Sequence, residues 1–260
     1  SFPGQSELWR QLLSFLEALS QQHDALTEAG VAITGQIMPA VANLMVSSAS
    51  TDSRFVGVRV FCDMLLFYLA HARAGDRAAW AGMDEASAFL REHVVQNLAP
   101  LLGDEEPIPL YALKLASASL EFDEALMQDM VELSLVQEFV SFLRLEHPNN
   151  NVHNMRVCRT AVGSRYVGTA ALEELGVVER VVAVLEYAYD NSVETFLEPA
   201  LEICTALLER WEAEEEPSEG AALLREVIPL IVQPLAQHDD AAIGTCAQLC
   251  LAKMQDAISA

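Results

Sequence analysis

The stretch LGVVERVVAVLEYAYDNSVETFLEPALEICTALLE, residues 175–209, consists of two apolar segments separated by the polar break YDNS. In the segment VERVVAVL, which begins at Val178, apolar residues stand at the first, fourth, fifth, seventh and eighth places. Positions three and four apart lie on the same face of an α-helix, so this pattern predicts an amphipathic helix. The second segment, FLEPALEICTALLERW, predicts another helix, and the stretch is therefore typical of a helix–turn–helix unit.

Four other segments share this register: IMPAVANL from Ile37, VQNLAPLL from Val95, VQEFVSFL from Val136 and IPLIVQPL from Ile228. Each is followed by a polar break and a second apolar segment. The five starting positions, 37, 95, 136, 178 and 228, are separated by 58, 41, 42 and 50 residues. A period of about 40 residues is typical of stacked helical repeats. The longer gaps contain an extra segment, HARAGDRAAWAGMDEASAFL, and an acidic stretch, WEAEEEPSEGAA.

The spacing predicts an all-α chain that forms a single right-handed α-solenoid of about five repeats over residues 1–260. The expected parts are an N-terminal capping helix pair over 1–32, repeats near 33–72, 84–122, 127–164, 170–211 and 221–258, an inserted loop at 73–83 and an acidic loop at 211–222. A helical bundle that shares only the amphipathic period is the alternative.

Several segments resemble known repeat families. Residues 175–209, with Gly176 before the long helix, resemble an armadillo repeat, whereas residues 227–254, with Pro229 early in the first helix, resemble a HEAT repeat. The VGVR segment ends at Arg59, where HEAT repeats often place a Val-Arg pair. The segment EEPIPLYALKLASASLE, residues 105–121, is similar to the armadillo-type tails of Fused and Unc-51-like kinases or pseudokinases. That resemblance implies a cytoskeletal or ciliary association.

The charge balance limits the class of partner. The chain carries 38 acidic and 15 basic residues, a net charge of −23, so phosphate backbones and anionic membrane surfaces should repel it. The apolar run at 58–72 is short for a membrane span and contains Asp63, which predicts a buried helix. Five cysteines without framework spacing indicate reduced thiols, and therefore a cytoplasmic protein. Because the sequence begins at Ser1, we expect it to be part of a longer protein.

The sequence shows no recognisable motif for catalysis or cofactor binding. The sequence contains neither a Gly-rich phosphate loop nor a Gly-X-Ser-X-Gly elbow. Cys246 and Cys250 stand four residues apart on one helix face, but no second Cys or His pair follows at metal-ligand spacing. We therefore expect no enzyme, no cofactor and no metal site.

One window differs from the rest of this acidic chain. Residues 147–171 contain no Asp or Glu, although they include three arginines and four asparagines. The resemblance to armadillo grooves implies that Asn154, Arg156, Arg159 and Arg165 hold an extended acidic or phosphorylated peptide, since guanidinium groups suit carboxylates and phosphates. The structural alternative is that HPNNN is a turn and that the arginines pair with glutamates of neighbouring repeats.

Two further positions complete the expected partner-binding set. Trp80 lies in the extra segment, where an exposed aromatic side chain would be an anchor, and packing against a neighbouring helix is its alternative. Arg59 is included on the HEAT resemblance, and the Glu-rich loop could contact a basic partner. The sequence thus favours a non-enzymatic scaffold that binds a protein partner, either a peptide or a helix. A cytoskeleton- or tubulin-binding array at the tail of a Fused-like kinase, or a dimerising tail, are the alternatives.

Overall fold

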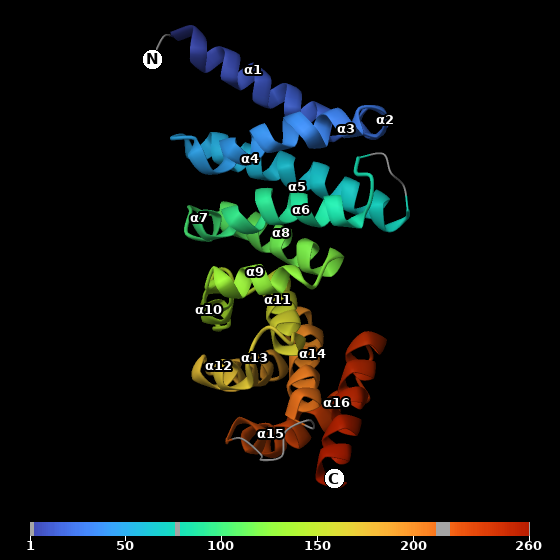
Figure 1. Ribbon diagram of the computed structural model, residues 1–260. Coiled ribbons are helices and arrows are strands. Elements are labelled where there is room, and N and C mark those ends of the chain that lie inside the picture. Colours follow the sequence, from blue (N-terminus) through green and yellow to red (C-terminus); the bar gives the residue numbers. More distant parts are fainter. Residues whose placement is uncertain (1–2, 76–78, 212–218, 260) are drawn as a thin grey trace. The chain divides into compact units, whose positions relative to one another are not determined.

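The computed structural model describes residues 3–75, 79–211 and 219–259, and within these ranges every regular element is a helix (Figure 1). Contacts divide the chain into two compact units, Ser1–Asp129 (unit 1) and Met130–Ala260 (unit 2), and each is described by itself. The all-α class expected from the period is confirmed. The single continuous array and the limits of its repeats stay predictions.

Unit 1 is built from short and long helices that follow one another closely. In chain order they are α1 (Pro3–Ser20), α2 (His23–Glu28), α3 (Gly30–Ala32), η1 (Ile33–Ile37), α4 (Met38–Ser47), α5 (Thr51–Arg73), α6 (Met83–His93), η2 (Val95–Asn97), α7 (Leu98–Leu102) and α8 (Ile108–Phe122). A last helix, α9 (Leu126–Glu132), crosses the boundary between the units. The segment η1 is a π-helical turn inside an otherwise continuous helix from α3 to α4.

Helix α5 forms the centre of unit 1, since it packs against α1, α4 and α8. Phe61 and Tyr68 of this helix are fully buried, and the Tyr68 hydroxyl donates to the Leu26 carbonyl at 2.9 Å. Burial raises the pKa of Tyr68 to about 12. Helices α5 and α4 are in close contact at Gly57, where a Cβ would stand 3.5 Å from Met45, an ordinary van der Waals distance.

Two stretches of unit 1 are long and apolar enough to cross a membrane by length and composition. They are Gly30–Ser47 and Thr51–Arg73, and in an apolar window of 18 residues from each, 39% and 50% of the window are buried inside the structure. The core helix of a folded unit meets the same criteria. The packing of α5 against three neighbours therefore accounts for its apolar composition.

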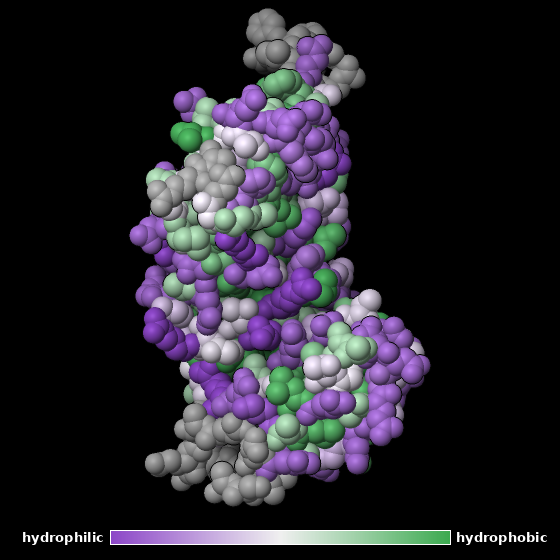
Figure 2. Space-filling model, turned by 90° about the vertical axis from the view of Figure 1, so that its right-hand side faces the viewer, coloured by the Kyte–Doolittle hydropathy of each residue, from purple (hydrophilic) through white to green (hydrophobic). Residues whose placement is uncertain are grey.

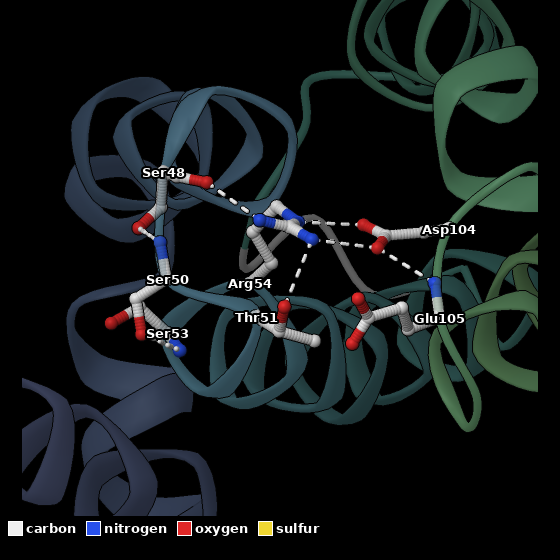
Figure 3. A network of polar contacts seen from close by, with 7 residues as sticks. All are labelled: Ser48, Ser50, Thr51, Ser53, Arg54, Asp104 and Glu105. Atoms are coloured by element: carbon white, nitrogen blue, oxygen red, sulfur yellow. Dashed lines mark hydrogen bonds and ion pairs between the residues drawn. The ribbon is translucent and has the colours of Figure 1, made fainter.

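A polar network joins the α4–α5 turn to the segment after α7 (Figure 3). Arg54 donates from Nε and Nη2 to the two carboxylate oxygens of Asp104, at 2.6 and 2.7 Å, and from Nη1 to the Ser48 carbonyl at 2.8 Å. Both side chains are mostly buried, with 17% and 11% of their surfaces exposed. The hydrogen bond from Arg54 holds the pKa of Asp104 below its ordinary value. Such a bidentate pair fixes one helix pair against the next.

Unit 2 contains longer helices in two layers. They are α10 (Leu135–Phe142), α11 (Val152–Gly163), α12 (Thr169–Glu174), α13 (Val177–Asp190), α14 (Glu194–Trp211), α15 (Glu219–Leu235) and α16 (Ala241–Ser259). One layer is formed by α11, α14 and α16, in which α14 lies between the other two (Figure 1). In the other layer α13 packs on α14 and α15, and α15 packs on α16. This is the helix stacking of the α-solenoid class.

Backbone and side-chain details set the turns of unit 2. Gly176 has φ 63°, a left-handed conformation that costs glycine little, and it starts α13. Arg210 of α14 reaches the α11–α12 connection and donates to the carbonyls of Val162 (2.7 Å), Ser164 (3.1 Å) and Val167. It also donates to Thr169 Oγ1 at 2.9 Å. One side chain thus binds three carbonyls and one hydroxyl in and beside this connection.

Candidate functional site

The phase of helix α11 decides which way the acid-free window faces. The side chain of Asn151 caps the helix by accepting from the backbone N–H groups of His153 and Asn154. With the helix begun there, Met155, Val157, Cys158, Ala161 and Val162 are buried. Arg156 and Arg159, three residues apart, are exposed on one face of α11. The sequence left this orientation open.

Three of the four asparagines of the window are buried, and the fourth caps α11. Asn154 is fully buried, and its Nδ2 donates to the Phe139 carbonyl of α10 at 3.1 Å. Asn149 and Asn150 are also buried, and Asn151 is the helix cap. The structure therefore corrects the expectation for Asn154, because an amide enclosed between α10 and α11 does not reach the surface where a ligand would lie.

Arg165 follows α11, and its side chain contacts the adjacent residue Tyr166. Its guanidinium lies 4.9 Å from the centre of the Tyr166 ring, and its Nη2 donates to the Tyr166 hydroxyl at 2.9 Å. It belongs to the connection between α11 and α12, so the helix face that carries Arg156 and Arg159 does not include it.

The two candidates of unit 1, Trp80 and Arg59, differ in exposure. Trp80 is only 6% exposed and packs against Tyr68 and Phe89, with ring centroids 6.0 and 5.4 Å apart. The structure thus follows the packing alternative rather than an exposed anchor. Arg59 is partly exposed, lies 5.5 Å from the Phe55 ring and forms an ion pair with Glu17.

The exposed residues of α11, α14 and α16 form the candidate surface, which we call the α11/α14/α16 face. Arg159 Nε lies 3.8 Å from the Glu202 carboxylate, and Lys253 Nζ lies 3.5 Å from Glu209. Between them is a hollow of about 130 Å³ lined by Arg159, Glu202, Thr205, Ala206, Glu209, Cys246 and Leu249. Leu249 is 50% exposed, so this face combines charged groups of both signs with one apolar side chain.

A group of potential metal ligands borders the same hollow. The ligand atoms of Glu198, Glu202 and Cys246 all lie within 4.8 Å of one another. Burial, followed by the charges of Glu202 and Glu198, raises the pKa of the Cys246 thiol. The thiol is therefore protonated near neutral pH. Since Arg159 already supplies a positive charge beside Glu202, we assign no metal to this group.

Sequence reasoning missed the acidic row of α14. Glu198, Glu202 and Glu209 recur at intervals of four and seven residues, which places them on one helix face. That spacing was visible in the sequence. The contact of Glu202 with Arg159 was not, because it joins helices 43 residues apart in sequence, from 159 to 202. The glutamates at 212, 214, 215 and 216, for which a basic partner was expected, lie outside the described residues.

On the face of the molecule drawn in Figure 2, hydrophilic residues cover most of the surface, and hydrophobic residues lie between them in small groups. Recognition on such a surface depends on hydrogen bonds and charge, with single apolar side chains as anchors.

Comparisons with known proteins agree with this architecture. Residues 2–128 match the model of "Serine/threonine-protein kinase ULK4-like, HEAT repeats", and residues 134–238 match the "RUNKEL ARM-repeat domain". The serine/threonine-protein kinase RUNKEL of Arabidopsis thaliana is 27% identical over 210 residues, which is 81% of this chain. The chain spans only 15% of the length of that kinase.

Solved structures show the same fold. The designed armadillo repeat protein YIII(Dq)4CqI superimposes with a TM-score of 0.62 at 16% identity, covering 94% of each chain. An engineered protein from the Northeast Structural Genomics Consortium gives a TM-score of 0.59 at 14% identity, covering 95% of this chain and 97% of the other. The resemblances expected from residues 105–121 and 175–209 are confirmed. The chain is an armadillo/HEAT-type helical repeat protein that resembles the repeat regions of Unc-51-like and RUNKEL kinases.

Proposed function

We propose that this chain is the non-enzymatic interaction region of a larger intracellular protein, and that it binds a protein partner on the α11/α14/α16 face. Armadillo and HEAT folds present extended surfaces of stacked helices, which suit peptides and helices of other proteins. The observation that carries the proposal is the exposure of Arg156 and Arg159 on one helix face beside the hollow between α14 and α16.

The charges of this face indicate how a partner would be recognised. Arg156 forms no ion pair with a described residue, and Arg159 has only a long contact to Glu202. An acidic or phosphorylated segment of a partner can therefore bind the two guanidinium groups, and few existing interactions of Arg156 and Arg159 are lost. Leu249, half exposed in the same hollow, offers a contact for one apolar side chain of that segment.

The test is affinity purification with the Arg156→Glu/Arg159→Glu variant, with co-purified proteins quantified by mass spectrometry. We expect at least one partner of the unaltered chain to be lost about tenfold or more, which corresponds to about 1.4 kcal/mol. The control is Arg73→Glu in unit 1, where the 3.7 Å contact with Glu121 joins two exposed side chains, and it should retain the partners. Retention of every partner by the Arg156→Glu/Arg159→Glu variant would contradict the proposal.

A second candidate is a cytoskeletal role as part of the tail of a Fused-like kinase. The names of the matching models and of the RUNKEL relative support the kinase-tail part of this candidate, and the cytoskeletal part rests on the resemblance of residues 105–121 to Fused-like tails. Co-sedimentation with microtubules at physiological salt separates the two candidates. Sedimentation of the chain with microtubules, unchanged in Arg156→Glu/Arg159→Glu, would favour the cytoskeletal role over the proposed one.

A further inference from the structure

A second hollow in unit 2 is formed by residues outside the α11/α14/α16 face. It has a volume of about 540 Å³ and lies between the segment that follows α10 and the first half of α13. We call it the α10–α13 groove, and it is lined by Leu143, Arg144, Leu145, Glu146, His147, Glu179, Arg180, Ala183 and Val184. Ligand pockets commonly measure about 300–1,000 Å³, so the groove can hold two or three side chains of a peptide.

The apolar part of the groove comes from both sides. Leu143 and Val184 are buried at its base, whereas Leu145 is 43% exposed at its edge. Covering such an apolar surface with another apolar side chain is favourable by about 25 cal/mol per Å² removed from water. Leu145 therefore offers an accessible apolar contact for a side chain of the size of leucine or methionine.

Two arginines of the groove are held in place by backbone carbonyls. Arg144 Nε donates to the Ser141 carbonyl at 2.9 Å, and Arg180 Nε donates to the Leu175 carbonyl at 3.1 Å. Neither guanidinium has an ion pair with a carboxylate among the described residues, although the chain has 38 acidic residues. The Nε hydrogen bond fixes the orientation of each guanidinium, and its other N–H groups remain available as donors. A guanidinium of this kind binds a carboxylate oxygen strongly.

The other charged and titratable groups of the groove are accounted for. A carboxylate oxygen of Glu179 lies over Gly176, where a Cβ would stand 3.4 Å from it, so this charge sits at the N-terminus of α13 and is stabilised there. The His147 ring stacks on Phe142 at 4.6 Å, and its Nδ1 accepts from the Asn149 N–H at 3.1 Å. Glu146 stays exposed at the rim and would repel a ligand with several negative charges.

We propose that the α10–α13 groove binds a peptide segment of a protein partner in which a leucine-sized apolar side chain stands beside a single carboxylate. The apolar side chain would cover Leu145 at the edge of the groove, and the carboxylate would accept from the free guanidinium donors of Arg144 and Arg180. This site is separate from the one under the proposed function, and either can exist without the other.

The experiment is a selection of random linear peptides displayed on phage against the immobilised chain. We expect the selected peptides to share an Asp or Glu next to Leu, Met or Phe. For a selected peptide carrying a fluorescent label, anisotropy should show about a tenfold or greater loss of affinity for Arg144→Gln/Arg180→Gln. Replacing the acidic residue of the peptide by its amide should have the same effect.

Two further variants keep the test decisive if the loss of the two Nε hydrogen bonds affects folding. Ala183 is exposed and lines the groove, so Ala183→Trp should block binding without removing a hydrogen bond. Arg156→Gln/Arg159→Gln removes the same charge from the other face and should bind the peptide normally. The proposal is overturned if no acidic–apolar peptide is selected, or if the selected peptide binds Ala183→Trp as tightly as the unaltered chain. Loss of binding only in Arg156→Gln/Arg159→Gln would overturn it while supporting the proposed function.

Discussion

The arginines of the two units have different neighbours. In unit 1, Arg54, Arg59, Arg73 and Arg91 each lie within ion-pair distance of a carboxylate, respectively that of Asp104, Glu17, Glu121 and Asp129. In unit 2, Arg144, Arg156 and Arg180 have no such carboxylate among the described residues, and Arg210 binds backbone carbonyls instead. The same residue type thus fixes helices in unit 1, whereas in unit 2 it also leaves charge available at the surface.

This difference separates structural arginines from arginines available for binding. A guanidinium that is mostly buried and satisfied by fixed acceptors contributes to stability, and its removal leaves those acceptors unpaired. An exposed guanidinium without a partner contributes little to stability and can bind another molecule at little cost. Substitutions of single arginines or of their partners can therefore test the comparison.

The largest effect is expected for Arg210→Ala. This substitution leaves the carbonyls of Val162, Ser164 and Val167 without a donor, and all three residues are buried. We expect the free energy of unfolding to fall by about 3–5 kcal/mol, since each unpaired buried group costs about 1–3 kcal/mol. Urea denaturation measures the loss, and hydrogen exchange should locate it to residues 162–169.

The control for this prediction lies in the same connection. Arg165→Ala removes an exposed side chain whose guanidinium lies on the Tyr166 ring, so it should change the free energy of unfolding by no more than about 0.5 kcal/mol. A loss below about 1 kcal/mol for Arg210→Ala would show that water replaces the guanidinium and that the connection does not depend on it.

A smaller loss is expected for Asp104→Asn in unit 1. The amide keeps the shape of the side chain but loses the charge that accepts two hydrogen bonds from Arg54. We expect destabilisation of about 2 kcal/mol, because hydrogen bonds to charged groups contribute about 1.5–3 kcal/mol. Glu124→Gln, at an exposed position of the same unit, is the matched control and should be neutral. Equal stability of the two variants would contradict the structural role of the Arg54–Asp104 pair.

The same pair predicts a pH dependence. Because Arg54 lowers the pKa of Asp104 in the folded chain below its ordinary value of 3.8, the carboxylate contributes stability that is fully present above that value. This contribution is lost as the pH falls through the folded-state pKa. The difference in unfolding free energy between the unaltered chain and Asp104→Asn should therefore be constant from neutral pH to about pH 5 and shrink below about pH 4. A difference that grows on acidification would contradict the assignment.

The fold could be predicted from the sequence because the apolar pattern of each helix lies within one short segment. Apolar residues three and four apart define helices such as α13 without reference to any other segment. The phase of α11 was also available in principle, since Met155, Val157 and Cys158 mark its inner face and leave Arg156 and Arg159 outside. The burial of Asn154 follows from the same phase.

Contacts between distant segments could not be predicted in this way. Trp80 is enclosed because Tyr68 and Phe89, which precede and follow it on two helices, meet around it. The α10–α13 groove depends on Arg144 and Arg180, which belong to different helical hairpins. Periodicity gives the face of each helix but not the identity of the residue that lies opposite.

The smallest effect on stability is expected for Arg156→Gln/Arg159→Gln. Arg159 has 54% of its side chain exposed and only a 3.8 Å contact with Glu202, and an exposed pair of this kind contributes about 0–1 kcal/mol. We therefore expect the urea midpoint to change little, by the equivalent of about 0.5 kcal/mol or less. By contrast, Arg91→Gln breaks a pair in which Nε lies 2.9 Å from both oxygens of Asp129, so it should be measurably less stable. If the double variant proved the less stable of the two, the exposed arginines of α11 would serve the fold, and the distinction between the two units would fail.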